Sequence, residues 1–187
     1  MRTLYTIFTI FTVSCVFPAI QADEIEETRE YYNDVMERLD DEYGLYRTEI
    51  SINTEDGIYP AIGNYQETIT FYWGAEGGYE WLVLVIWTGE YASRRTYGEI
   101  LYEPQAFLED RKEEVVFQYV SDLDWDGNTT EYQWWYDSNG LLQSSATTTF
   151  PDEVVEFIPD GPEDYPYIYT PQRMQEIFYM IHSRQYS

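Results

Sequence analysis

A continuous apolar run, Trp-Leu-Val-Leu-Val-Ile-Trp from Trp81 to Trp87, restricts the fold more than any other feature of the chain. Glycine-rich sequence precedes the run at Gly74–Gly78, and Gly89 follows it. Seven residues is an ordinary strand length, and a strand that is apolar at every position is covered on both faces. The run therefore predicts a central strand with further structure packed on each side of its sheet.

Alternating apolar and polar residues predict more strands around this one. Between Tyr46 and Asn53, large side chains alternate with Arg47, Glu49 and Ser51, which is typical of a half-buried strand. The same reading predicts strands at 65–73, 95–102, 113–121, 129–137, 141–150 and 153–158, with a short helical connection at 104–112. Short links between them, above all Asn139-Gly140, favour antiparallel hairpins over parallel crossovers.

Helical spacing is found near both ends of the chain. Residues Asp23–Tyr43 place Ile25, Tyr32, Val35, Met36, Leu39 and Tyr43 on one stripe. Thr170 and Pro171 are the preferred residues at a helix start, and the helix they open buries Met174, Ile177, Phe178 and Ile181.

These elements predict an α+β fold. We expect an N-terminal helix, a curved antiparallel meander of about seven strands resembling half a barrel, and a C-terminal helix. A β-sandwich with flanking helices is the alternative. The 165 residues from Asp23 to Ser187 suffice for one domain with a single core.

The first 22 residues have the pattern of a secretory signal peptide. Arg2 precedes an apolar stretch, and Ala22 suits the position before cleavage. Thr, Ser and Pro residues interrupt the apolar run before it reaches the ~20 residues of a membrane-spanning helix. We therefore predict an exported protein, in the periplasm, at the cell surface or secreted, that is not an integral membrane protein. Lipid attachment at Cys15 is the alternative to cleavage after Ala22.

The charge of the chain is strongly acidic, with 35 Asp and Glu against 10 Lys and Arg. Repulsion by phosphate excludes nucleic acid as a favoured partner. A cationic protein, a carbohydrate or an apolar ligand remains compatible with the composition. Cys15 is the only cysteine, so cleavage after Ala22 would leave a mature chain with neither disulfides nor thiolate chemistry.

One segment carries a metal-binding pattern. Asp122, Asp124 and Asp126 precede Gly127 at alternating positions, as in D-x-D-x-D-G calcium loops. Asn128 would add a backbone carbonyl and Glu131 a closing carboxylate. Counted from Asp122, position twelve of the loop is Gln133, whereas an EF-hand has glutamate there. The residues on either side of the loop are predicted strands and not helices, so the segment is not an EF-hand. The sequence thus predicts either a structural calcium site or an acidic hairpin turn.

Aromatic residues form a second pattern on the following hairpin. A two-residue loop at Asn139-Gly140 would pair Tyr132 with Thr147, Trp134 with Ser145 and Tyr136 with Gln143. Large rings opposite small polar residues could form a stacking platform for sugars or flat ligands. The alternative, which we prefer, is that these rings fill the core.

Catalytic motifs do not emerge from the sequence. His182 is the only histidine, and neither G-x-S-x-G, H-E-x-x-H nor a Walker motif occurs. We therefore expect a non-catalytic domain that binds a ligand or partner and carries the calcium loop. A carboxylate-based polysaccharide hydrolase, and an envelope carrier with an aromatic-lined apolar bowl, are the alternatives.

Overall fold

The computed structural model describes residues 19–39, 44–53, 58–59, 63–91, 94–104, 113–165 and 168–182. Its elements are α1 (Ala19–Leu39), β1 (Tyr46–Ile52), β2 (Ile58–Tyr59), β3 (Gly63–Glu76), β4 (Tyr79–Tyr91), β5 (Arg94–Pro104), β6 (Glu113–Leu123), β7 (Thr129–Asp137), β8 (Gly140–Thr149), β9 (Val154–Phe157), a 3-10 turn η1 (Pro162–Asp164) and α2 (Pro171–His182). The helical connection predicted at 104–112 lies outside the described residues, apart from Pro104, which ends β5.

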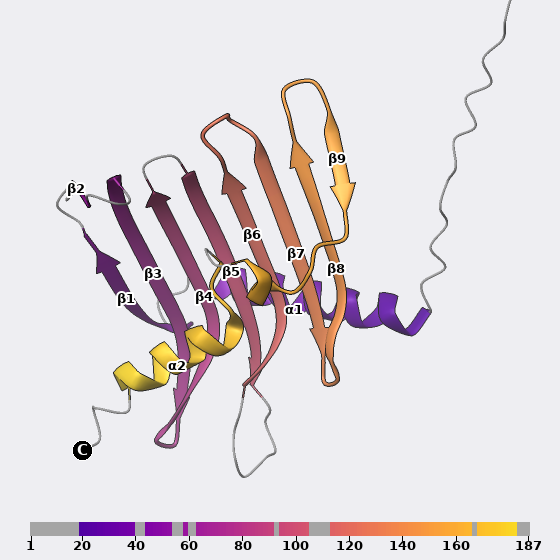
Figure 1. Cartoon of the computed structure of the whole chain (residues 1–187). Helices are drawn as coiled ribbons and strands as arrows, with labels where there is room; N and C mark the ends of the chain where they lie inside the picture. The colour runs from indigo at the N-terminus through magenta and orange to yellow at the C-terminus, as the bar shows by residue number, and fades with distance from the viewer. Residues whose placement is uncertain are drawn as a thin grey trace, which may run out of the picture.

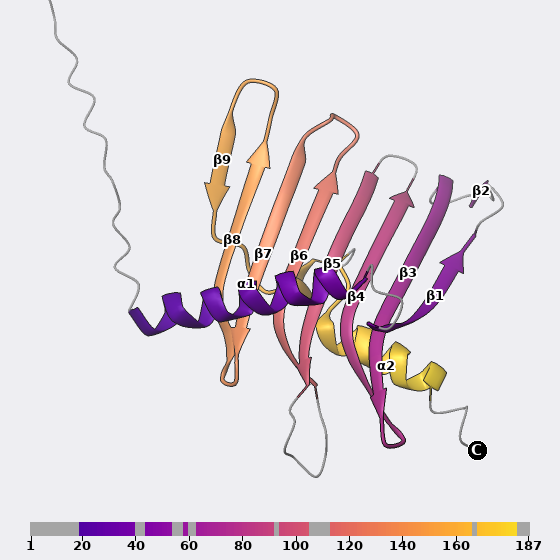
Figure 2. The ribbon, with the colours of Figure 1, turned by 180° about the vertical axis from the view of Figure 1, so that it is seen from behind.

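The strands form one open antiparallel sheet in the order β1-β3-β4-β5-β6-β7-β8-β9, with β2 paired to β3. The two helices lie on opposite faces of this sheet, α2 in front in Figure 1 and α1 in front in Figure 2. The predicted α+β meander between two helices is confirmed. Eight strands follow one another along the main path instead of about seven, and the sandwich alternative is wrong because these strands share one sheet.

The central position predicted for the apolar run is also confirmed. β4 lies between β3 and β5, and Leu82, Val83, Leu84 and Val85 are each at most 1 % exposed. Leu82 and Val85 belong to the core beneath α2, whereas Val83 and Leu84 belong to the core beneath α1. Both faces of the strand are therefore covered, by different helices.

Three β-bulges are aligned across the sheet. The bulged residues, which have no partner on the neighbouring strand in the register, are Val83 in β4, Val116 in β6 and Leu142 in β8. Each of them precedes a residue that belongs to one continuous row of paired residues across the sheet. That row runs Tyr72, Leu84, Leu101, Phe117, Trp135, Gln143. A bulge can direct two successive side chains to one face. Val83 with Leu84, and Val116 with Phe117, thereby widen the apolar surface on which Val35 of α1 packs.

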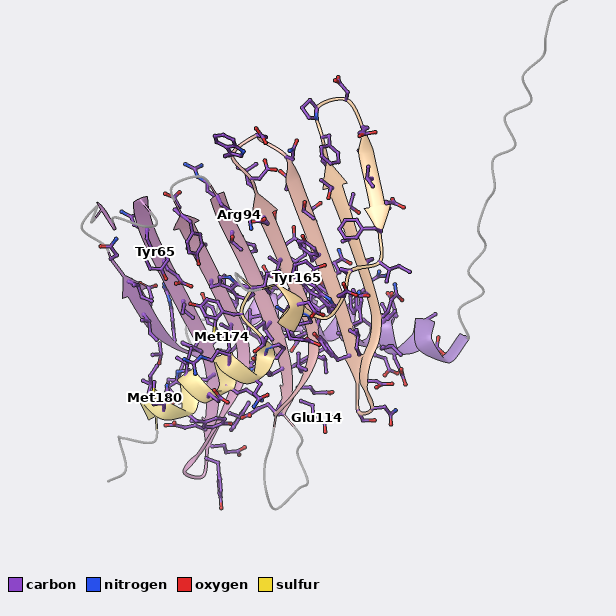
Figure 3. The ribbon with its side chains drawn as sticks, in the orientation of Figure 1. Tyr65, Arg94, Glu114, Tyr165, Met174 and Met180 are labelled. Atoms are coloured by element: carbon purple, nitrogen blue, oxygen red, sulfur yellow. The ribbon has the colours of Figure 1, made fainter. Side chains whose placement is uncertain are left out.

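The α2 face holds the larger core cluster. Thr170 caps α2, its hydroxyl accepting a hydrogen bond from the Arg173 backbone N–H at 3.3 Å, as the Thr-Pro sequence predicts. Met174 and Phe178 of α2 are fully buried against the sheet, and Figure 3 shows Met174 on the helix in front of the strands. The N–H of Trp134 donates to the Asp160 carbonyl at 2.8 Å, which ties the segment before α2 to the same face.

The predicted register of the β7–β8 hairpin is wrong. Tyr132 pairs with Ala146, Trp134 with Ser144 and Tyr136 with Leu141. Asp137 pairs with Gly140, so the loop residues are Ser138 and Asn139, and Gly140 begins β8 with φ +121°. The Asp137 carboxylate accepts the Asn139 N–H at 2.7 Å and stabilises this turn. The bulge at Leu142 then shifts the remaining pairs by one residue.

Candidate functional site: the pocket between α1 and the sheet

The first predicted calcium ligand, Asp122, lies at the end of β6 and faces the α2 side. It is 5 % exposed, its carboxylate is 3.4 Å from the Arg94 guanidinium, and it accepts a hydrogen bond from the Thr96 hydroxyl at 3.1 Å. Burial raises the pKa of Asp122, and the Arg94 charge and the Thr96 bond oppose that rise. This carboxylate is thus already paired with a cation.

The remaining predicted ligands belong to the β6–β7 turn and to β7. Asp124 accepts the Asn128 backbone N–H at 2.9 Å and the Asn128 amide at 3.0 Å, and these bonds lower its pKa. The Asn128 carbonyl accepts the Asp124 N–H at 3.0 Å, Gly127 turns the chain at φ +84°, and Asp126 is exposed. Glu131 accepts the Tyr119 hydroxyl at 2.5 Å.

Strand alternation separates two of these ligands. Asp122 pairs with Thr130, so the neighbouring Glu131 directs its side chain to the opposite face of the sheet, the α1 side. The turn brings Asp124 and Asn128 together, while Asp122 and Glu131 bond to different partners on different faces. No group of three acidic, histidine or cysteine side chains arranged for a metal ion occurs among the described residues. The calcium site stays a prediction.

The three residues of the predicted stacking platform are packed in the α2-side core. Trp134 is fully buried and Tyr132 is 6 % exposed. Their rings stack at 5.4 Å between centroids, and the ring of Tyr165 lies 5.1 Å from that of Tyr132. Tyr136 is partly buried against the same cluster. The rings fill the core, as the preferred alternative predicts, and do not form an open platform.

A pocket of about 420 Å³ lies on the other face, between α1 and the middle of the sheet. α1 crosses the strands here (Figure 2). The pocket is lined by Arg29, Tyr32 and Asn33 of α1, Glu99 of β5, Phe117 and Tyr119 of β6, and Gln133 and Trp135 of β7. Its size falls within the ~300–1,000 Å³ of small-molecule sites, and aromatic walls with a few polar groups are their usual composition.

Glu99 lies at the polar end of this pocket and is 6 % exposed. It accepts hydrogen bonds from Tyr32 of α1, at 2.7 Å, and from Tyr97 on its own strand. Burial, followed by these bonds to Glu99, raises the pKa of both tyrosines far above the ordinary range. Burial likewise raises the pKa of Tyr119 to about 12, with its bond to Glu131 as the second cause. The phenols therefore stay protonated and hold the Glu99 and Glu131 carboxylates in place.

Trp135 lies at the aromatic end. Its ring centroid is 4.3 Å from that of Phe117, and the Arg29 guanidinium carbon is 5.4 Å from the Trp135 ring, within cation–π range. Gln133 lies two residues before Trp135 on β7, on the same face of the sheet, and it pairs with Tyr119, which in turn pairs with Glu99. Within the described part of the chain its amide makes no hydrogen bond, so both its donor and acceptor groups are available to a ligand.

Sequence reasoning missed this pocket because Tyr97, Glu99 and Tyr119 carry no motif. The signal available was the opposite face of the β7–β8 hairpin, where Gln133 and Trp135 alternate with the core rings. His182, the only histidine, is 3 % exposed, and its Nδ1 lies 2.8 Å from the Glu80 carboxylate. It anchors the end of α2 to β4.

Among the described residues, no helix has the length and apolar character to cross a membrane. Comparison of the chain with protein-family models, with curated proteins and with solved structures gave no match. The pocket between α1 and the sheet is therefore interpreted from its own chemistry.

Proposed function

We propose that the protein is a non-catalytic binding protein for a small polyhydroxylated ligand of the carbohydrate class, held in the pocket between α1 and the sheet. The observation that carries this proposal is the Gln133 amide, which is without a hydrogen bond in the described structure and lines the same pocket as the Trp135 ring and the Glu99 carboxylate. Sugars use this combination, because their C–H faces pack on aromatic rings while their hydroxyls need both donors and acceptors.

The negative charge of the chain and of the pocket further restricts the class of ligand. The chain has a formal net charge of −25, and the carboxylates of Glu99 and Glu131, each bonded to a tyrosine hydroxyl, both lie on the α1 side of the sheet. Both features disfavour an anionic ligand, and among the described residues that line the pocket Arg29 is the one cation. The mixture of amides, carboxylate and tyrosines favours a neutral polar ligand over the apolar cargo of a carrier protein.

Export with removal of the first 22 residues remains part of the proposal, because this cleavage would not remove any residue that lines the pocket. Cleavage after Ala22 would fall within α1, which begins at Ala19. The first residue that lines the pocket is Arg29, so the mature chain would keep the whole site.

Binding of a panel of neutral mono- and disaccharides, measured by calorimetry on wild type, Gln133→Ala and Gln143→Ala, tests the proposal. Gln143 is the matched control, because it lies across from Trp135 on the same face but does not line the pocket. Loss of the ligand's hydrogen bonds to Gln133 should weaken binding about tenfold, equivalent to ~1.4 kcal/mol. Gln143→Ala should bind as wild type does.

Two results would contradict the proposal. Either no saccharide binds to the wild-type protein, or the two glutamine variants lose affinity equally. Release of reducing sugar from a polysaccharide by wild type, abolished in Glu99→Gln, would instead establish the hydrolase alternative.

A further inference from the structure

Among the strands that the structure describes, β9 forms one edge of the sheet and has β8 as its single neighbour (Figure 1). All four of its residues are exposed. Val154 is 62 % exposed, and Ile158, which follows the strand, is 84 % exposed. Natural edge strands are usually protected by charged side chains, proline, a bulge, a covering segment or a very short length. Between Val154 and Ile158 the only such residue is the charged Glu156.

The hydrogen-bond pattern shows which backbone groups of β9 are unpaired. The Phe150 N–H donates to the Glu153 carbonyl at 2.9 Å, so these two residues form a hydrogen-bonded pair. In an antiparallel ladder such pairs alternate with pairs whose backbone groups point away from each other. Val155 and Phe157 therefore bond to β8, while Val154 and Glu156 direct their N–H and C=O groups outward, away from the sheet.

The charge around this edge has a single sign. From Glu113 to Gln172, which includes β6 to β9 and the segment before α2, the chain has 13 acidic residues and no lysine or arginine. A second copy placed edge to edge would bring two such surfaces together and be repelled. A cationic strand would place its lysine or arginine side chains beside Glu156, on the face opposite Val155 and Phe157.

We propose that β9 is a docking edge to which an extended, cationic segment of another polypeptide adds as a further strand. Main-chain bonds would form to Val154 and Glu156, and apolar side chains of the segment would cover Val155 and Phe157 on the α2 face. The strand is only four residues long, so few backbone bonds form and much of the affinity comes from charge. This surface is separate from the pocket beneath α1.

A synthetic peptide with alternating lysine and valine residues, fluorescently labelled, serves as the probe, with an equivalent glutamate–valine peptide as the charge control. Fluorescence anisotropy with the full chain should detect binding of the lysine peptide only. The affinity should fall about tenfold or more between 0.05 M and 0.5 M sodium chloride, because the Debye length shrinks severalfold.

Val154→Pro separates strand addition from nonspecific charge attraction. Proline removes an outward N–H that β8 does not use, and it is tolerated at such edge positions. Val154→Pro should weaken the lysine peptide about tenfold, whereas Val154→Ala, which keeps the N–H, should bind within about twofold of wild type. Glu156→Pro tests the second outward N–H, and circular dichroism melts show that each variant is folded.

Three outcomes would overturn this proposal. The wild type does not bind the lysine peptide, the folded proline variants bind it as well as wild type does, or the glutamate peptide binds equally. Concentration-dependent self-association of wild type that Val154→Pro abolishes would assign the edge to a second copy of the chain instead.

Discussion

Gly98 and Trp87 show how strongly one residue depends on another in this sheet. They are direct partners on β5 and β4, and Trp87 is 1 % exposed. The six-membered ring of Trp87 lies over Gly98, in the space that a Cβ atom at position 98 would occupy. An aromatic ring that covers a strand glycine compensates for the missing side chain. This pairing could not be predicted from the sequence, because the register of the two strands is needed to recognise it.

Gly98→Ala should therefore destabilise the protein by about 1–3 kcal/mol, the usual cost of overpacking a core. Urea unfolding of wild type and variant measures the difference. In a Trp87→Leu background the ring is gone, so the added methyl group should cost less than about 0.5 kcal/mol. Equal costs in both backgrounds would show that overlap with Trp87 is not the cause.

At the scale of elements, the sequence predicted each long strand and both helices to within a few residues at most described boundaries. The boundaries of strands and helices could be predicted because they depend on neighbouring residues in the sequence. Alternation of apolar and polar residues marks the strands, glycine and asparagine mark the turns, and Thr-Pro marks the start of α2. The bulges at Val83, Val116 and Leu142 were not predicted. Where both faces of a strand are apolar, alternation no longer reports which residue faces which side. Phe117 and Trp135, which line the pocket, lie in the row next to these bulges, so alternation alone did not place them on the α1 face. Because Glu99 and Tyr119 carry no motif either, the pocket was missed for both reasons.

The β6–β7 turn gives the element-scale prediction. If Asp122, Asp124 and Asp126 bind calcium, the ion must compete with Arg94 for Asp122 and with the Asn128 amides for Asp124. Loops of this kind in extracellular modules bind at ~10⁻⁴–10⁻³ M. Millimolar calcium should then stabilise the protein by at most about 1.4 kcal/mol, which corresponds to a rise of at most ~3–6 °C in melting temperature for a domain of this size.

Magnesium and Asp124→Asn are the controls for this measurement. Magnesium should stabilise less, because its octahedral shell fits a flexible loop poorly. Asp124→Asn should lose the calcium response, because the central charge is removed while the turn preference is kept. If magnesium equals calcium, or if the variant responds fully, the Asp-Gly spacing serves only the turn that Asp124 and Asn128 already form.

At the scale of the whole molecule, the two helices and the sheet form three layers, and negative charges far outnumber positive ones in the chain. The described ion pairs include Arg47 with Glu49 and Arg95 with Glu90, both between exposed side chains. Such pairs contribute little to stability. With 35 acidic and 10 basic residues in the chain, most carboxylates have no cation to pair with, so repulsion among them opposes the compact state.

The melting temperature should therefore rise with sodium chloride when a chelator removes divalent ions. The Debye length falls from ~10 Å at 0.1 M salt to ~3 Å at 1 M, so repulsion across the sheet is screened while contacts within the two cores are not. Sodium sulfate is unsuitable here because it also strengthens hydrophobic burial, and the comparison should use chloride salts of several monovalent cations. Equal rises with each cation would identify screening as the cause. A flat or falling curve would mean that the acidic side chains, including the 13 between Glu113 and Gln172, lie too far apart in the folded chain to repel one another.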